Sequence, residues 1–226
     1  MNRPSTISLV AANLLMALFV VSQRWGYYSV ILIYWFEAMI IGVYGLARMC
    51  VACWFGNPLG KWIGMKDGAS RFMLSLFLGW FYIVKFGGVA VGMGLLVALT
   101  PGFLTGDDGG DGLRAIAIGL ENVGASALIA AAMFFVSHGV SFVYNFIGHN
   151  EYRHSNAIAL LFRPYLRMVL VLVVLAGGFG AAFAFPELHR TTAFAAGIVL
   201  IKLLADVVSH YIEHGRPRSP RLQPTG

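Results

Sequence analysis

Four ionisable side chains share one face of the last apolar segment of the chain. At 100° per residue, Lys202, Asp206, His210 and Glu213 fall within about 80° of arc on a helix. Lysine and aspartate cost about 3 kcal/mol each in the middle of a bilayer, so this face should turn toward other helices. Such a face is either a structural polar network that locks helices together or a site for protons, ions or a substrate.

Partners for these charges lie in two other apolar segments. Glu37 in "YWFEAM" and Lys85 in "YIVKFGG" are both near the middle of their segments. Two acids, Glu37 and Asp206, are therefore matched by two bases, Lys85 and Lys202. Because an unpaired buried charge is costly, we expect Glu37 to pair with Lys85 or Lys202, and Asp206 with Lys202 or His210.

A metal or haem site is another interpretation of some of these residues. His138 in "FFVSHGVSF" and His210, together with Asp206, would offer two imidazoles and a carboxylate, which suits zinc or non-haem iron. The two histidines alone would suit a b-type haem. The sequence "HYIEH" lacks the HExxH spacing, so no protease mechanism is transferred, and no particular cofactor follows.

The elements that carry these residues are long apolar runs. Hydrophobic residues make up 58% of the 226 positions and charged residues only 12%, which is typical of membrane proteins rather than water-soluble domains. Runs of about 20 apolar residues match the hydrocarbon thickness. We predict an all-α, polytopic transmembrane helical bundle in one domain, residues 1–214, followed by a basic cytoplasmic tail, residues 215–226. The predicted spans are about 5–22, 27–50, 72–99, 122–146, 165–185 and 191–211.

The basic residues predict the orientation of these spans. With both termini inside, eleven lysines and arginines lie on the inner side, and only Arg24, Arg114 and Arg190 lie on the outer side. The positive-inside rule therefore favours N-in and C-in, in a multi-pass protein of a bacterial inner membrane. Because the basic residues flank apolar runs, the net charge of +6 indicates topology and not a nucleic-acid partner.

Glycines and an inner loop indicate contacts. Gly88 and Gly92 form a G-x-x-x-G pattern, which is typical of close contact between helices. The loop between the fourth and fifth predicted spans is either a solvated loop that sets topology or a contact for a lipid phosphate or partner protein. Its candidate contact residues are Glu151, Arg153, His154 and Arg163.

Several motifs together resemble a known family. They are "YWFE", "SHGVSFVYNFI" running into "EYR", "RPY" before a "GGF" segment, and the closing "KLLADVVSHYIEH". The pattern resembles an uncharacterised family of bacterial polytopic membrane proteins, a domain of unknown function. The resemblance implies an integral-membrane helical fold and supplies no activity, substrate or cofactor.

Three functions are therefore open. The one we favour is binding or transport of a small molecule, an ion or protons through the intramembrane polar residues. The second is a structural or assembly subunit that packs against membrane-protein partners or a second copy of itself. The third is a membrane-embedded metal or haem protein. Whether the protein is an enzyme is left open.

Overall fold

The computed structural model describes residues 3–56, 68–105, 117, 121, 124–185, 187 and 191–214. Within these ranges the chain is helical and contains no strand, so the predicted all-helical class is confirmed. The proposed basic tail, residues 215–226, lies outside the described residues.

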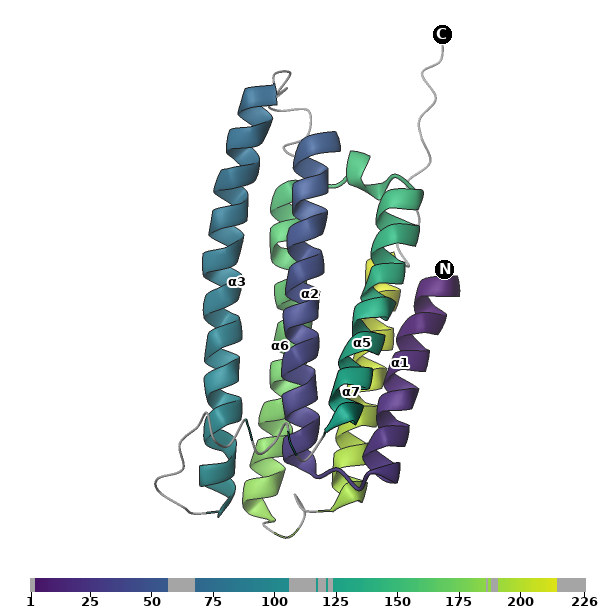
Figure 1. Ribbon diagram of the computed structural model, residues 1–226, viewed down its shortest axis with the longest axis vertical. Coiled ribbons are helices and arrows are strands. Elements are labelled where there is room, and N and C mark those ends of the chain that lie inside the picture. The colour runs from purple at the N-terminus through teal and green to yellow at the C-terminus, as the bar shows by residue number, and fades with distance from the viewer. Residues whose placement is uncertain are drawn as a thin grey trace.

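The long helices of the described residues occupy the six predicted segments (Figure 1). They are α1 (Arg3–Ser22), α2 (Tyr27–Phe55), α3 (Gly68–Thr105), α5 (Ala125–Val140), α6 (Ala157–Ala184) and α7 (Thr192–His214). After α5 the chain continues as a π-helix, η2 (Ser141–Gly148), and then as a short 3₁₀ turn, η3 (Glu151–Arg153).

Three stretches of the described residues are long and apolar enough to cross a membrane. They are Tyr27–Phe55, Gly68–Leu99 and Leu128–Gly148, and the shorter apolar helix Ile7–Ser22 accompanies them. A run of 20 apolar residues matches the hydrocarbon thickness, and each of the three stretches reaches that length. The fold is that of a helical membrane protein.

Helix α2 is the centre of the bundle. It packs against α3, α5, α6 and α7, whereas α1 packs against α5 and α7. In Figure 1, α3 and α1 lie at opposite edges with α2 between them. Residues Val30 to Tyr34 of α2 are buried on every face, which is expected of a helix surrounded by others.

Helices α2 and α3 approach closely because two glycines face large rings. A side chain at Gly42 would overlap the ring of Phe86, and one at Gly45 would overlap the hydroxyl of Tyr82. Tyr82 donates a hydrogen bond to the carbonyl of Gly42 at 3.0 Å. These contacts fix the rotation of α3, and therefore which of its residues turn toward α2.

Candidate functional site

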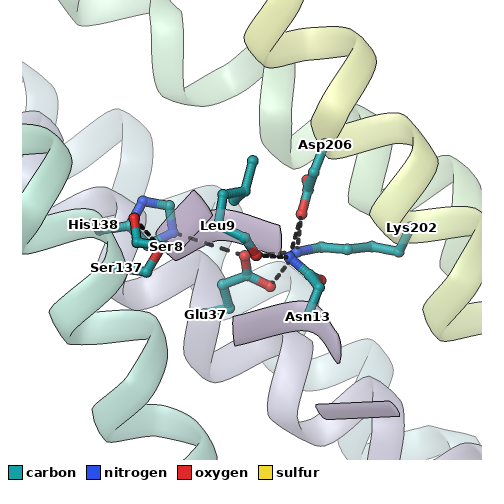
Figure 2. A network of polar contacts seen from close by, with 8 residues as sticks. All are labelled: Ser8, Leu9, Asn13, Glu37, Ser137, His138, Lys202 and Asp206. Carbon is teal, nitrogen blue, oxygen red and sulfur yellow. Dashed lines mark hydrogen bonds and ion pairs between the residues drawn. The ribbon is translucent and has the colours of Figure 1, made fainter. Parts of the chain in front are cut away.

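Three of the predicted charged residues meet in the centre of the bundle (Figure 2). The ammonium of Lys202 on α7 donates to both carboxylate oxygens of Glu37 on α2, at 2.6 Å each. It also donates to Asp206, one helical turn away on α7, at 2.5 Å. Among the alternatives that the sequence left open, the structure shows Glu37 paired with Lys202 and Asp206 paired with Lys202.

The ammonium of Lys202 is enclosed almost completely. Lys202 is 1% exposed and Glu37 2%. The aromatic rings of Tyr34 and Phe134 complete the enclosure, with centroids 4.9 and 5.3 Å from the nitrogen. Three acceptor oxygens use the three N–H donors of the ammonium, and the ring faces add cation–π attraction. Because every N–H donor of the ammonium has an acceptor, the charge can exist where water is excluded.

Helix α1 adds a neutral hydrogen-bonding residue, Asn13, to this cluster. Its side-chain amide donates to the carbonyl of Leu9 at 3.0 Å and to Asp206 at 3.2 Å. Asn13 is 0% exposed, so its amide supports Asp206 without access to solvent. The second bond links α1 to α7 within the bundle (Figure 2).

An imidazole lies beside the ionic cluster. The Nε2 atom of His138 on α5 is 3.7 Å from a carboxylate oxygen of Glu37. His138 is 6% exposed, as is its neighbour Ser137, whose hydroxyl bonds to that of Ser8 on α1 at 3.5 Å. We call Asn13, Glu37, His138, Lys202 and Asp206 the central network.

His138 also lines a small cavity between α2, α5 and α6. The cavity has a volume of about 30 Å³, enough for about two water molecules. Its lining is Ile41, Tyr44, Gly45, Arg48, His138, Leu160, Arg163 and Pro164. His138 therefore contacts Glu37 and this cavity, and it connects the buried charges to a hydratable space.

The backbone changes its winding next to His138. Helix α5 ends at Val140, and residues Ser141–Gly148 form a π-helix. Arg48 of α2 donates to the hydroxyl of Ser141 at 3.3 Å, and the hydroxyl of Tyr44 donates to the carbonyl of Phe135 at 3.0 Å. Because π-helical turns occur frequently at functional sites, the π-helix beside His138 supports a functional role for this region.

Lys85 is not part of the central network. It lies on the exposed face of α3, where its ammonium stands 5.8 Å from the ring of Phe81. The sequence predicted that Lys85 lies near the middle of its helix, but it could not show the direction of the side chain. The expected balance of two acids by two bases is therefore not met, because of these two bases only Lys202 pairs with Glu37 and Asp206.

Other predicted residues are placed only in part. His210 and Glu213 belong to α7, but their side chains lie outside the described ones. Within the side chains that the structure describes, no group of three His, Cys, Asp or Glu residues is arranged to hold a metal ion. Because His210 is not among them, the metal site of His138, His210 and Asp206 stays a prediction.

The inner-loop candidates lie near the end of the π-helix. Glu151 and Arg153 belong to η3, His154 follows it, and the exposed Arg163 on α6 lines the small cavity. Arg153 donates to the hydroxyl of Tyr152 at 3.3 Å. Arg163 of α6 thus lies at the edge of the His138 cavity, whereas Glu151, Arg153 and His154 are not among its lining residues.

The glycine prediction is wrong for contacts within the described chain. A side chain built on Gly88 or Gly92 would meet nothing within 4 Å, so neither glycine packs against another described helix. The close contact between α2 and α3 depends on Gly42 and Gly45 instead. The reason is that α3 turns the side of Gly88 and Gly92 away from α2.

Three residues of the site were missed in the sequence. Tyr34 and Phe134 give no signal because an aromatic residue in an aromatic-rich helix is an ordinary apolar residue. Asn13 carried a signal, since a carboxamide in the apolar run "VAANLLMAL" is expensive in lipid unless it is bonded to another helix. That argument, applied to uncharged residues as well as ionisable ones, would have found it.

Residues 1–223 match a family model described as a family of unknown function, DUF6498. No curated protein and no solved structure matches the chain.

Proposed function

We propose a function for this chain, which belongs to the DUF6498 family of unknown function. It is a multi-pass inner-membrane protein that binds protons at its central network. The bound proton supports the transport of a small molecule or an ion. The observation that carries this proposal is the contact of His138 with buried Glu37 and with a hydratable cavity. Intramembrane ionisable groups are candidates for proton relays.

The charges of the network favour uptake of a positive charge. Glu37 and Asp206 contribute two negative charges and Lys202 one positive charge, so these three groups sum to −1 while His138 is neutral. Protonation of His138 brings the four groups to zero. Because a net charge is expensive in a water-poor interior, a proton on the imidazole is stabilised by Glu37.

The route for the proton is supported by the cavity. Arg48 and Arg163 lie in its lining with His138. Under the positive-inside rule, these arginines belong to the inner side, so the cavity would connect His138 with the cytoplasm. A bacterial inner membrane with both termini inside belongs to the same proposal.

The test is proton uptake by the purified protein in vesicles. When the pH is lowered from about 8 to about 5, we expect the natural protein to take up one more proton than His138→Gln does, because histidine titrates in this range. Ser137→Ala is the matched control, since Ser137 is equally buried on the same helix turn and carries no titratable group. Glu37→Gln should reduce the uptake, because the imidazolium loses its neighbouring negative charge.

Equal uptake by the natural protein and by His138→Gln would overturn the proposal. The other histidines of the chain contribute to both samples, so the difference between the two reports His138 alone. Histidine-selective carbon-13 NMR on the same samples then identifies the residue by the resonance that disappears in His138→Gln.

A further inference from the structure

The outer face of α3 carries a charge at the depth of the central network. Trp35 on α2 donates to the carbonyl of Ala90 on α3 at 3.0 Å, and Tyr82 on α3 donates to the carbonyl of Gly42 on α2. Lys85 lies between Tyr82 and Ala90, so it stands beside the part of α2 that holds Glu37. Residue 41 is the midpoint of α2, roughly 20 Å from either end.

The surroundings of Lys85 on this face are apolar. Phe77, Phe81, Val84 and Leu95 fall within about 100° of Lys85 around the helix, and all four are exposed. Among the described residues, the ammonium of Lys85 has a cation–π contact with the ring of Phe81, one turn away on the same helix. A lysine at this depth is too far from either end of α2 for its side chain to reach the headgroups, so it needs a counter-charge at mid-membrane.

Among the described residues, none covers the helix surface beside Lys85 at Gly88 and Gly92. Gly88 and Gly92 lie within about 60° of Lys85 around the helix, and no described atom approaches the place of a side chain on either glycine. Small residues at this spacing let another helix backbone come close. The combination of a charge with an open backbone indicates a helix as the occupant.

The occupant differs from a second copy of this chain. The described acids in the middle of the long helices are Glu37 and Asp206, and both are engaged by Lys202. A symmetric dimer through this face would therefore bring Lys85 toward Lys85 of the other copy with no carboxylate to separate them. An anionic lipid is also excluded, because its headgroup lies at the membrane surface.

We infer that the face of α3 formed by Phe81, Lys85, Gly88, Gly92 and Leu95 binds a transmembrane helix of a different protein, and that this helix carries an aspartate or glutamate at mid-membrane. The carboxylate pairs with Lys85, and the partner backbone packs over Gly88 and Gly92.

The test is site-specific photo-crosslinking of the full-length protein in its native membrane. A benzoylphenylalanine at position 95 should give one discrete heavier adduct, and one at Leu18 on α1, which is similarly exposed, should not. Lys85→Met should abolish the adduct and Lys85→Arg should retain it. Mass spectrometry should place the crosslink in a transmembrane segment of another protein that contains Asp or Glu.

Four outcomes would overturn the inference. They are adducts with lipid alone, an adduct of two copies of this chain, an adduct that Lys85→Met leaves unchanged, and a partner segment without a carboxylate. Both Lys85 variants should keep the elution profile of the natural protein, because Lys85 is exposed and supports no described contact between helices.

A defined probe tests the charge alone. The purified protein in phosphatidylcholine vesicles is mixed with a synthetic Leu/Ala transmembrane peptide that carries a central Asp, or with its Asn twin, and association is followed by energy transfer. The Asp peptide should bind about threefold more tightly or better, and Lys85→Met should remove the difference. Equal binding of the two peptides to the natural protein would contradict the role of Lys85.

Discussion

Two lysines at the same depth of this bundle have opposite surroundings. Lys202 is 1% exposed and is held by two carboxylates and two aromatic rings. Lys85 lies beside the same part of α2 but on the outside of α3, with one ring of its own helix in contact. The first lysine has its counter-charges within the chain, whereas no ion pair among the described residues includes the second. Depth therefore decides that a charge needs a partner, and helix rotation decides where that partner is.

The largest effect is expected from removing the inner lysine. Lys202→Met leaves the buried Glu37 and the half-buried Asp206 without the cation they share, which should lower the free energy of unfolding by about 3–5 kcal/mol. The measurement is unfolding by SDS titration in mixed micelles. Lys85→Met is the matched control and should show no loss, so equal destabilisation by the two variants would refute the comparison.

A double variant separates loss of the charge pair from loss of packing. Glu37→Gln combined with Lys202→Met removes one charge of each sign. The double variant should therefore lose less free energy of unfolding than the sum of the losses of the two single variants. If the two effects add, the contact between Lys202 and Glu37 contributes nothing of its own to stability.

The next largest effect concerns the packing that sets the rotation of α3. Gly42→Val would overlap the ring of Phe86 and should cost about 1–3 kcal/mol by overpacking. The same SDS titration measures it. Gly88→Val on the outer face is the control and should be neutral, because no described atom lies within 4 Å of a Cβ placed on Gly88. A neutral Gly42→Val would show that α2 and α3 pack in another way.

A smaller effect is expected at the hydrogen bond between α1 and α7. Asn13→Leu removes the donor to Asp206 and should cost about 0.6 kcal/mol, a typical value for a hydrogen bond between membrane helices. Leu14→Ala, a change at an exposed neighbour on α1, is the control for altered lipid contact. A loss as large as that for Lys202→Met would mean that Asn13 carries more of the network than its single bond to Asp206 indicates.

The sequence was sufficient to predict the helices and to place the charges near the middle of them. Apolar runs predicted the helices, since each run must span about 30 Å of hydrocarbon. The position of Glu37, Lys85 and Lys202 within their runs predicted that all three lie near mid-membrane. The helical period of α7 predicted that Lys202 and Asp206 share a face, and the structure confirms that they bond to each other.

The direction of each face was not predictable for α3. This helix is apolar on nearly every side, so its periodicity does not show which side faces the bundle. The direction is decided by contacts such as the one between Gly42 and Phe86, which depend on the shapes of two helices together. For that reason Lys85 seemed equivalent to Lys202 in the sequence, and the glycines beside it seemed to belong to the core.

The smallest effect on stability should accompany a large effect on binding. Gly92→Val adds a side chain where no described atom lies within 4 Å, so the SDS titration should give the free energy of the natural protein. In the membrane, the new methyl groups would keep a partner backbone away from α3, and the photo-crosslinked adduct at position 95 should decrease severalfold. If stability and adduct are both unchanged, the outer face of α3 contacts lipid, and Lys85 has no helical partner. A decrease in the adduct without loss of stability would instead separate the two faces of α3: the side of Phe86 holds the bundle together, and the side of Lys85 binds another protein.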